Sequence, residues 1–357
     1  MSTFHPIQIA NIEQSTSDCR IITLDVPIEL QSDFAYKQGQ YLTLKANING
    51  EEVRRSYSLC SSPLDKQWQI GVKKIPNGKF STYANDVLSI GDTLEVMVPQ
   101  GNFFVEVTDK IDKDYVAFAA GSGITPIHSI ISTHLQAEPN STFTLFYINQ
   151  STQSIILKES IEALKNQYLG RFRVFHFLTR EKRTAELFNG RIDTDKLNVL
   201  FSSICSTETI NDYFLCGPEA MIHLVKDYLV DNGVNESNVH FELFGTNTDQ
   251  AKERQATIAQ KYTGKSCDLT VKEGGKSFEI TVPQGESNVL DIALAHHADL
   301  PFACKGGVCA TCKCKLEEGN VEMLVSYGLE QEEIDNGYIL SCQSVPLSAK
   351  IIVDFDI

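Results

Sequence analysis

The chain lacks any apolar run long enough to cross a membrane, and it lacks an excess of positive charge. Its 357 residues carry 31 Lys and Arg against 46 Asp and Glu, a net charge of −15. Proteins that bind nucleic acid present basic surfaces, so this balance argues against such a partner. Residues 1–6 lack the charged start and apolar stretch of a secretory signal. We therefore expect a cytoplasmic protein with no membrane partner.

Cysteine, by contrast, is plentiful, with ten residues in the chain. Without a secretory signal, clustered cysteines more often bind metal than form disulfides. Cys304, Cys309 and Cys312 stand in a C-x4-C-x2-C run, and Cys342 follows later, which is the ligand order of a plant-type [2Fe–2S] cluster. Gly306 and Gly307 would let the backbone close around such a cluster.

Two other interpretations of these cysteines are open. A structural zinc site usually draws its thiolates from paired knuckles with two residues between the cysteines, which this spacing does not provide. Disulfides are disfavoured by the reducing compartment. Cys314, two residues after a predicted ligand, is expected to pack as a small apolar residue.

The chain divides into three segments that differ in their pattern of apolar and polar residues. Residues 1–108 contain short alternating strands between turns, which predicts an antiparallel β-barrel. Residues 109–245 alternate apolar runs with helical stretches, the pattern of an α/β domain with a parallel sheet. A polar stretch, residues 246–264, is predicted to be a linker, and residues 265–357 a small mixed sheet crossed by a helix.

The first segment carries residue types that suit a flavin. Arg55 could hold a pyrophosphate, Tyr57 could stack on a ring, and Ser58 could hydrogen-bond a ring nitrogen. The stretch Gly78-Lys79-Phe80-Ser81-Thr82 predicts a turn into a helix, with Ser81 or Thr82 capping it and amides free for an anion. Taken alone, each motif fits an ordinary strand or capped helix equally well.

The second segment carries three candidate nucleotide motifs. Gly121, Gly123 and Thr125 follow an apolar strand and precede a helix, where a turn places phosphate on helix amides, although Pro126 breaks the full G-x-G-x-x-G pattern. Cys216, Gly217 and Pro218 end a later strand, where a thiol could meet a nicotinamide. Three residues could hold a ribose 2′-phosphate: Thr179, Arg180 and Arg183. A tight turn, an inert thiol and surface arginines are the alternatives.

In this order, the motifs resemble the plant-type ferredoxin–NADP reductase family with a plant-type ferredoxin domain fused at the C-terminus. The resemblance covers nearly the whole chain and implies an FAD barrel, a nucleotide domain and a β-grasp [2Fe–2S] domain. It implies flavin contacts at Arg55, Tyr57, Ser58, Val72, Lys73, Gly78, Lys79, Phe80, Ser81 and Thr82. It places Phe244 where relatives return toward the flavin, and it favours NADPH, with NADH possible.

The resemblance implies electron transfer with no catalytic acid, base or nucleophile. A nicotinamide delivers two electrons as a hydride and the cluster accepts one, so a flavin has to stand between them. The expected acceptor is an oxygenase component with non-haem iron, docking on residues 265–357, which hold 7 Lys, no Arg and 15 acidic residues. The alternatives are another oxygenase, hydroxylase or desaturase as acceptor, or a non-enzymatic metal-binding protein with a relic front half.

Overall fold

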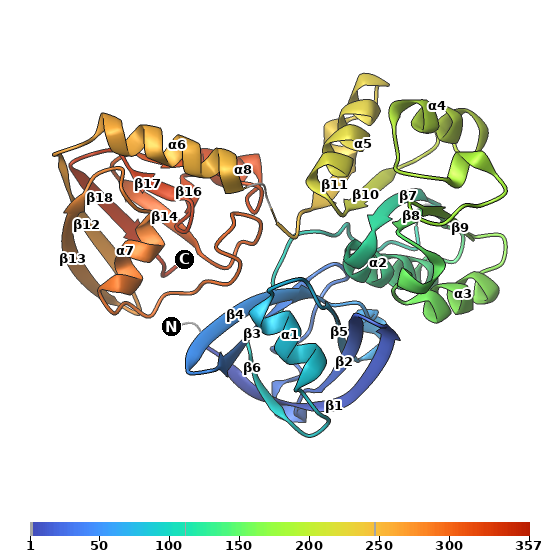
Figure 1. Ribbon diagram of the computed structural model, residues 1–357, viewed down its shortest axis with the longest axis horizontal. Coiled ribbons are helices and arrows are strands. Elements are labelled where there is room, and N and C mark those ends of the chain that lie inside the picture. Colours follow the sequence, from blue (N-terminus) through green and yellow to red (C-terminus); the bar gives the residue numbers. More distant parts are fainter. Residues whose placement is uncertain (1–2, 111, 246–247) are drawn as a thin grey trace. The chain divides into compact units, whose positions relative to one another are not determined.

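A computed structural model describes residues 3–110, 112–245 and 248–357 (Figure 1). The chain forms two compact units: His5–Val53 with Tyr57–Phe244, and Gly245–Ile357, with which Arg54–Ser56 are grouped. The first unit holds the barrel and the α/β domain, and the second holds the cysteine loop. Among the described residues, no helix has the length and apolar character that a membrane crossing requires.

The predicted antiparallel barrel is confirmed as a six-stranded sheet in the order β4-β3-β6-β1-β2-β5. Its strands are β1 (His5–Thr16), β2 (Cys19–Asp25), β3 (Tyr41–Ile48), β4 (Glu51–Ser58), β5 (Trp68–Lys73) and β6 (Thr93–Val96), and its short helices are η1 (Ile28–Leu30), η2 (Pro63–Asp65) and α1 (Lys79–Asp86). Strand β1 was not predicted, because polar residues dominate it. Ile7 and Ile9 are its fully buried apolar residues, and they pack into the barrel core with Leu42, Leu44 and Ile70.

The α/β domain is also confirmed, as a five-stranded parallel sheet in the order β11-β10-β7-β8-β9. The strands are β7 (Asp114–Ala120), β8 (Thr142–Asn149), β9 (Phe172–Leu178), β10 (Asp212–Cys216) and β11 (Val239–Glu242). The helices are α2 (Ile124–Ala137), α3 (Lys158–Gln167), α4 (Thr194–Ser203) and α5 (Glu219–Asp231), with short turns η3 (Gly121–Gly123), η4 (Thr152–Ser154), η5 (Glu186–Phe188) and η6 (Glu236–Asn238). Helices α2 and α3 cover one face, and α4 and α5 the other (Figure 1).

The C-terminal unit is a mixed sheet in the order β13-β12-β18-β14-β16, with a two-stranded sheet of β15 and β17. The elements are α6 (Thr248–Lys261), β12 (Ser266–Glu273), β13 (Lys276–Pro283), α7 (Val289–Ala295), β14 (Lys313–Glu318), β15 (Val321–Met323), α8 (Gln331–Asp335), β16 (Tyr338–Leu340), β17 (Ser344–Pro346) and β18 (Lys350–Asp354). Helix α7 buries Val289 and Leu290 against the sheet, as in a β-grasp fold.

Most of the predicted linker is helical. Helix α6 occupies residues 248–261 of the stretch 246–264, and it belongs to the C-terminal unit. The Arg254 guanidinium donates to the Leu324 carbonyl oxygen at 3.3 Å and contacts a Glu322 carboxylate oxygen at 2.7 Å, and Ile258 is buried beside Gly285. The polar composition of this stretch hid the helix, because a helix with one narrow buried stripe is polar on most of its surface.

His128 on α2 joins three parts of the first unit. Its Nδ1–H donates to the Cys60 carbonyl oxygen and its Nε2 accepts from the Ser160 hydroxyl, both at 2.7 Å. Burial lowers the pKa of His128 below its ordinary 6.5, so the ring is neutral at pH 7 and Nε2 is the acceptor. Cys60 follows barrel strand β4 and Ser160 lies on α3, so the imidazole links the barrel to the α/β domain.

Acid is therefore expected to weaken this unit through His128. Below pH 6.5 the unfolded chain takes up a proton that the folded ring resists, so the contribution of His128 to stability is complete above pH 6.5. Below pH 6.5 that contribution falls by up to about 1.4 kcal/mol per pH unit. Urea unfolding between pH 7 and 5.5, followed by the fluorescence of the single tryptophan, Trp68, should show this loss as a difference between wild type and His128→Asn. His223→Asn, which replaces a side chain that is 42 % exposed, should follow the wild type; equal pH dependence in wild type and His128→Asn would refute the assignment.

Candidate cofactor sites

The two edges of the barrel sheet form the candidate flavin site. Strands β4 and β5 stand at the two ends of the strand order, and an isolated bridge joins Leu59 to Ile70 between them. Backbone groups along such edges stay available to a planar ligand. Strand β4 carries Arg55, Tyr57 and Ser58, three of the predicted contacts. The Tyr57 ring is partly buried and lies 5.5 Å from the Phe80 ring.

Other predicted flavin residues lie on β5 and α1. The side chains of Val72 and Phe80 are buried in the barrel core, so their backbone groups are what they can offer a cofactor. Lys73 pairs with Asp18 at 3.7 Å and Lys79 pairs with Glu51 at 2.5 Å. Both cations are therefore engaged at the barrel surface.

The start of α1 differs from the prediction in its capping. Gly78 is the N-cap residue and no side chain caps the helix. Ser81, predicted as a cap with Thr82, instead accepts from the Ile75 amide at 3.3 Å. Thr82 donates its own amide to the Gly78 carbonyl oxygen at 3.0 Å. No side chain caps the amides that precede Thr82 in the first turn of α1, and such uncapped amides suit the binding of a diphosphate.

Two turns meet where β7 and β10 lie side by side. One is the Gly121–Gly123 turn before α2, and the other joins β10 to α5 through Cys216, Gly217 and Pro218. A Cβ on Gly123 would lie 2.2 Å from the Cys216 carbonyl oxygen, so only glycine allows this contact. Strand order reverses between β7 and β10, and open α/β sheets bind ligands at that point.

A residue that the sequence did not reveal, Glu242, lies at this meeting point. It ends β11, is paired in register with Cys216, and accepts a hydrogen bond from the Ser58 hydroxyl at 3.1 Å. Burial raises the pKa of the Glu242 carboxyl to about 8, although the Ser58 hydrogen bond opposes part of that shift. The Ser58 hydroxyl, the Cys216 thiol and the Glu242 carboxyl thus lie close together where the barrel meets the parallel sheet. Phe244, two residues further on, is 45 % exposed.

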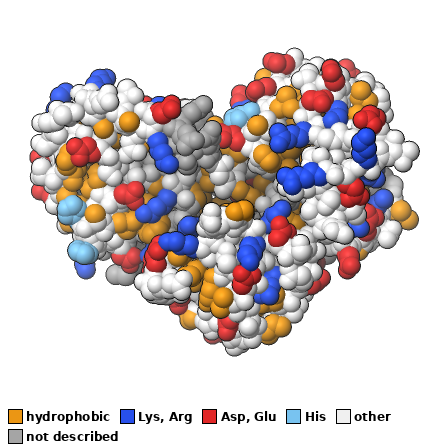
Figure 2. Space-filling view, in the orientation of Figure 1, with side chains coloured by type: hydrophobic (Ala, Val, Ile, Leu, Met, Phe, Trp, Pro, Cys, Tyr) orange, Lys and Arg blue, Asp and Glu red, His pale blue; other side chains and the backbone are white. Residues whose placement is uncertain are grey.

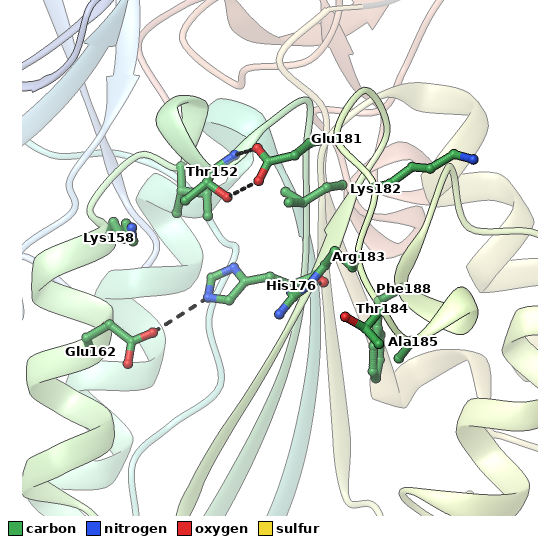
Figure 3. Close-up of a pocket in the computed structure, with 12 residues that line it drawn as sticks. Thr152, Lys158, Glu162, His176, Glu181, Lys182, Arg183, Thr184, Ala185 and Phe188 are labelled. Atoms are coloured by element: carbon green, nitrogen blue, oxygen red, sulfur yellow. Dashed lines mark hydrogen bonds and ion pairs between the residues drawn. The ribbon is translucent and has the colours of Figure 1, made fainter.

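A cavity of about 590 Å³ opens beyond the ends of β8 and β9 (Figure 3). Its lining includes three cationic side chains: Lys158, Lys182 and Arg183. Among the described residues, none of the three forms an ion pair with a carboxylate, although Arg183 donates to the His176 carbonyl oxygen at 2.7 Å. Unpaired cations around a cavity favour an anionic ligand.

The two carboxylates of the cavity are held by other groups. Glu181 accepts hydrogen bonds from the Thr152 amide at 2.7 Å and from the Thr152 hydroxyl at 2.8 Å. The hydrogen bond from the amide is the larger cause of the lowered pKa of Glu181. Glu162 lies 3.9 Å from His176 Nε2. Burial lowers the pKa of His176, so the ring is neutral near pH 7. Figure 3 shows the Lys182 side chain extending away from the Glu181–Thr152 and Glu162–His176 contacts.

The three predicted ribose contacts, Thr179, Arg180 and Arg183, differ in their position relative to this cavity. Thr179 and Arg180 donate their amides to the carbonyl oxygens of Asn149 and Gln150, at 2.9 and 2.8 Å. Neither lines the cavity, whereas Arg183 does. Lys158 and Lys182 were not predicted from the sequence as candidate binding residues, because only the folded chain brings them to the same cavity.

The cluster loop arranges its thiols as two pairs. Cys309 Sγ lies 3.1 Å from Cys304 Sγ, and the Cys312 and Cys342 thiols are hydrogen-bonded to each other. Each pair can supply two thiolates to one of two irons, the ligand set of a [2Fe–2S] cluster. Cys314 belongs to neither pair and is fully buried in the core of this unit, as expected.

Backbone amides surround these sulfurs. The Gly306 amide donates to Cys304 Sγ at 3.3 Å, and the Gly307 amide faces Cys342. The hydrogen bond from Cys309, with the amide donors, lowers the pKa of the Cys304 thiol to about 6. Gly307 has φ +73°, and a Cβ there would lie 2.8 Å from Val325. The loop therefore fits thiolates that bind iron and would be crowded by larger residues.

Comparisons with known proteins identify three domains in this chain. Family models match the oxidoreductase FAD-binding domain over residues 6–105, the oxidoreductase NAD-binding domain over 118–227 and the 2Fe-2S iron-sulfur cluster binding domain over 271–347. The chain is 42% identical over 356 residues to a subunit of 1,2-phenylacetyl-CoA epoxidase from Escherichia coli, covering 100% of this chain and 99% of that protein.

More distant relatives share the same architecture. The ferredoxin reductase component of 3-ketosteroid-9-alpha-monooxygenase from Rhodococcus rhodochrous is 32% identical and covers 98% of this chain and 96% of its own length. The structure of phthalate dioxygenase reductase matches 99% of this chain and 98% of its own, with a TM-score of 0.61 and 25% identity. The chain therefore belongs to the ferredoxin–NADP reductase family with a fused plant-type [2Fe–2S] domain, and it is an NAD(P)H-dependent flavin iron–sulfur oxidoreductase.

Proposed function

We propose that the chain is the reductase component of a phenylacetyl-CoA epoxidase, passing electrons from NADPH to an oxygenase component in the cytoplasm. The observation that carries this is the full-length 42% identity to the Escherichia coli protein. Residues 72–81, 98–104 and 304–313 are the stretches in which we see the likeness to that reductase most strongly. We further propose that the acceptor holds non-haem iron.

Different residues of this chain would hold each of the cofactors. A bound FAD would supply the link between a two-electron hydride donor and a one-electron acceptor such as the [2Fe–2S] cluster. Arg55, Tyr57, Ser58 and the α1 amides would hold FAD, and the Gly121–Gly123 turn would hold the nucleotide diphosphate. Cys216 and Glu242 would flank the nicotinamide. Cys304, Cys309, Cys312 and Cys342 would hold the cluster.

The acceptor is tested by reconstitution. Purified chain, NADPH, phenylacetyl-CoA and the epoxidase oxygenase component should together consume NADPH and form the epoxide. A ketosteroid or glycine betaine oxygenase component should give less than a tenth of that rate, since those reductases are more distant relatives of this chain. Equal rates with every oxygenase would contradict the assignment to one acceptor.

The domain on which we propose that the acceptor docks, residues 265–357, is not uniformly acidic. Figure 2 shows Lys and Arg side chains among the Asp and Glu side chains on the visible face of the C-terminal unit. Several cations of this unit form ion pairs, as Lys313 does with Glu333 at 2.8 Å and Lys272 with Glu317 at 2.6 Å. The excess negative charge of residues 265–357 still favours a basic acceptor surface and a rate that falls with salt.

The choice of NADPH over NADH is proposed to depend on the cavity cations. A 2′-phosphate would meet Lys158 and Lys182, so Lys158→Ala and Lys182→Ala should each raise the KM for NADPH by about tenfold. The KM for NADH should stay within twofold. Lys165→Ala, next to Glu162 on α3 and outside the cavity lining, is the control and should change neither. Equal increases for both nucleotides would mean that the cations do not bind the 2′-phosphate.

A further inference from the structure

Tyr147 connects two parts of the nucleotide domain through one hydroxyl group. It lies on β8, its side chain is fully buried, and its phenol proton is shared between two carbonyl oxygens. These are the oxygens of Gly121 at 3.1 Å and Ile156 at 3.2 Å. A buried hydroxyl with two backbone acceptors fixes the distance between the segments that carry them.

The first acceptor belongs to the diphosphate turn. Gly121 opens the turn with φ +54°, and its carbonyl group precedes the amides that lead into α2. At the other end of the turn, Thr125 donates its hydroxyl to the Ser122 carbonyl oxygen at 3.0 Å. Tyr147 therefore anchors the side of the turn that faces β8.

The second acceptor belongs to the wall of the cavity. Ile156 lies between Ile155 and Lys158, two residues that line the cavity. The next amide, that of Leu157, donates to the Ser15 hydroxyl at 2.9 Å, so the segment is held from both sides. The Tyr147 ring also lies 5.8 Å from the ring of His176, another lining residue, shown in Figure 3.

We propose that Tyr147 is a positioning residue that sets the spacing between the Gly121–Gly123 turn and the cavity, so that one pyridine nucleotide spans both. The inference rests on the proposed function, in which the cavity receives the adenosine half. A ligand that binds two subsites gains from their linkage only when their separation matches its own length. Loss of the hydroxyl would reduce that gain without removing a ligand contact.

The test compares the whole dinucleotide with its adenosine half. Tyr147→Phe keeps the buried ring and removes the hydroxyl. We expect the KM for NADPH to rise five- to tenfold, with kcat within twofold, while the Kd of 2′,5′-ADP stays unchanged. Tyr213→Phe is the matched control, because Tyr213 is equally buried on β10 of the same parallel sheet and donates to the Thr207 carbonyl oxygen at 3.4 Å. The control should leave both constants unchanged.

Three outcomes would overturn the proposal. An unchanged KM for NADPH in Tyr147→Phe would show that the hydroxyl does not set the spacing. Equal weakening of NADPH and 2′,5′-ADP would show that it acts on the cavity alone. If Lys182→Ala leaves 2′,5′-ADP binding intact, the cavity does not receive the adenosine phosphate. That last outcome refutes the cavity assignment itself, whereas the first two leave it standing.

Discussion

Cys342→Ser is expected to abolish the iron–sulfur absorption of the protein and to reduce electron transfer to the oxygenase by more than a hundredfold. Cys342 is one half of the second thiol pair, and a serine hydroxyl is a far poorer iron ligand than a thiolate at neutral pH. NADPH-dependent reduction of ferricyanide should persist, because it needs the flavin and nucleotide sites of the other unit. Iron and sulfide content, the visible spectrum and the two activities measure the result.

Cys314→Ala provides the matched control for that experiment. Cys314 is buried close to the cluster loop but stands outside both thiol pairs, so its removal should leave iron and sulfide at two each per chain. A full cluster in Cys342→Ser would mean that another thiol is the fourth ligand. Loss of ferricyanide reduction together with the cluster would show that the two sites are not separate.

Glu242→Gln is expected to remove a large pH dependence from the stability of the first unit. In the folded chain the Glu242 pKa is about 8 against an ordinary 4.5, because burial disfavours the charged carboxylate. Below pH 4.5 both states hold the proton and the contribution of Glu242 to stability is complete. Between pH 4.5 and 8 the unfolded chain releases the proton, so that contribution falls by up to about 1.4 kcal/mol per pH unit.

The glutamine variant keeps an acceptor for Ser58 and does not titrate. Its unfolding free energy, measured with urea and Trp68 fluorescence, should therefore be flat or nearly so over pH 6.5–8, and below pH 6.5 it should show only the acid loss expected from His128. The kinetics should change in parallel, because a group that titrates near pH 8 beside the nicotinamide site would give wild-type ferricyanide reduction an inflection there. Glu208→Gln, on an exposed loop, is the control and should behave as wild type in both assays. A wild-type slope in Glu242→Gln would show that another group titrates.

The parts of the molecule that the sequence predicted are those whose residues are close in the chain. Three cluster thiols lie within nine residues, and the Gly121–Gly123 turn is contiguous with its strand and helix. The three domains and their order were likewise predicted, because the periods of apolar residues differ between an antiparallel barrel and a parallel sheet. In these cases the residue types within a short segment and the spacing of its apolar residues were sufficient for the prediction.

The missed features depend on contacts between distant segments. Glu242 meets Ser58 across 184 residues, and nothing near either position in the sequence indicates the pairing. The cavity combines Lys158, after a left-handed Leu157, with Lys182 and Arg183 from the next loop. The capping at α1 was misassigned because Ser81 bonds backward to Ile75 and does not cap the helix.

Helix α6 has a consequence for anyone who would transplant the iron–sulfur domain onto another flavoprotein. A graft that starts at residue 265 would leave Glu322 without Arg254 and expose the surface around Gly285 that Ile258 covers. The portable module therefore begins before Thr248, and a connecting segment of chosen length has to be added ahead of the helix. The helix that resembles a linker in the sequence therefore has to be transferred together with the iron–sulfur domain.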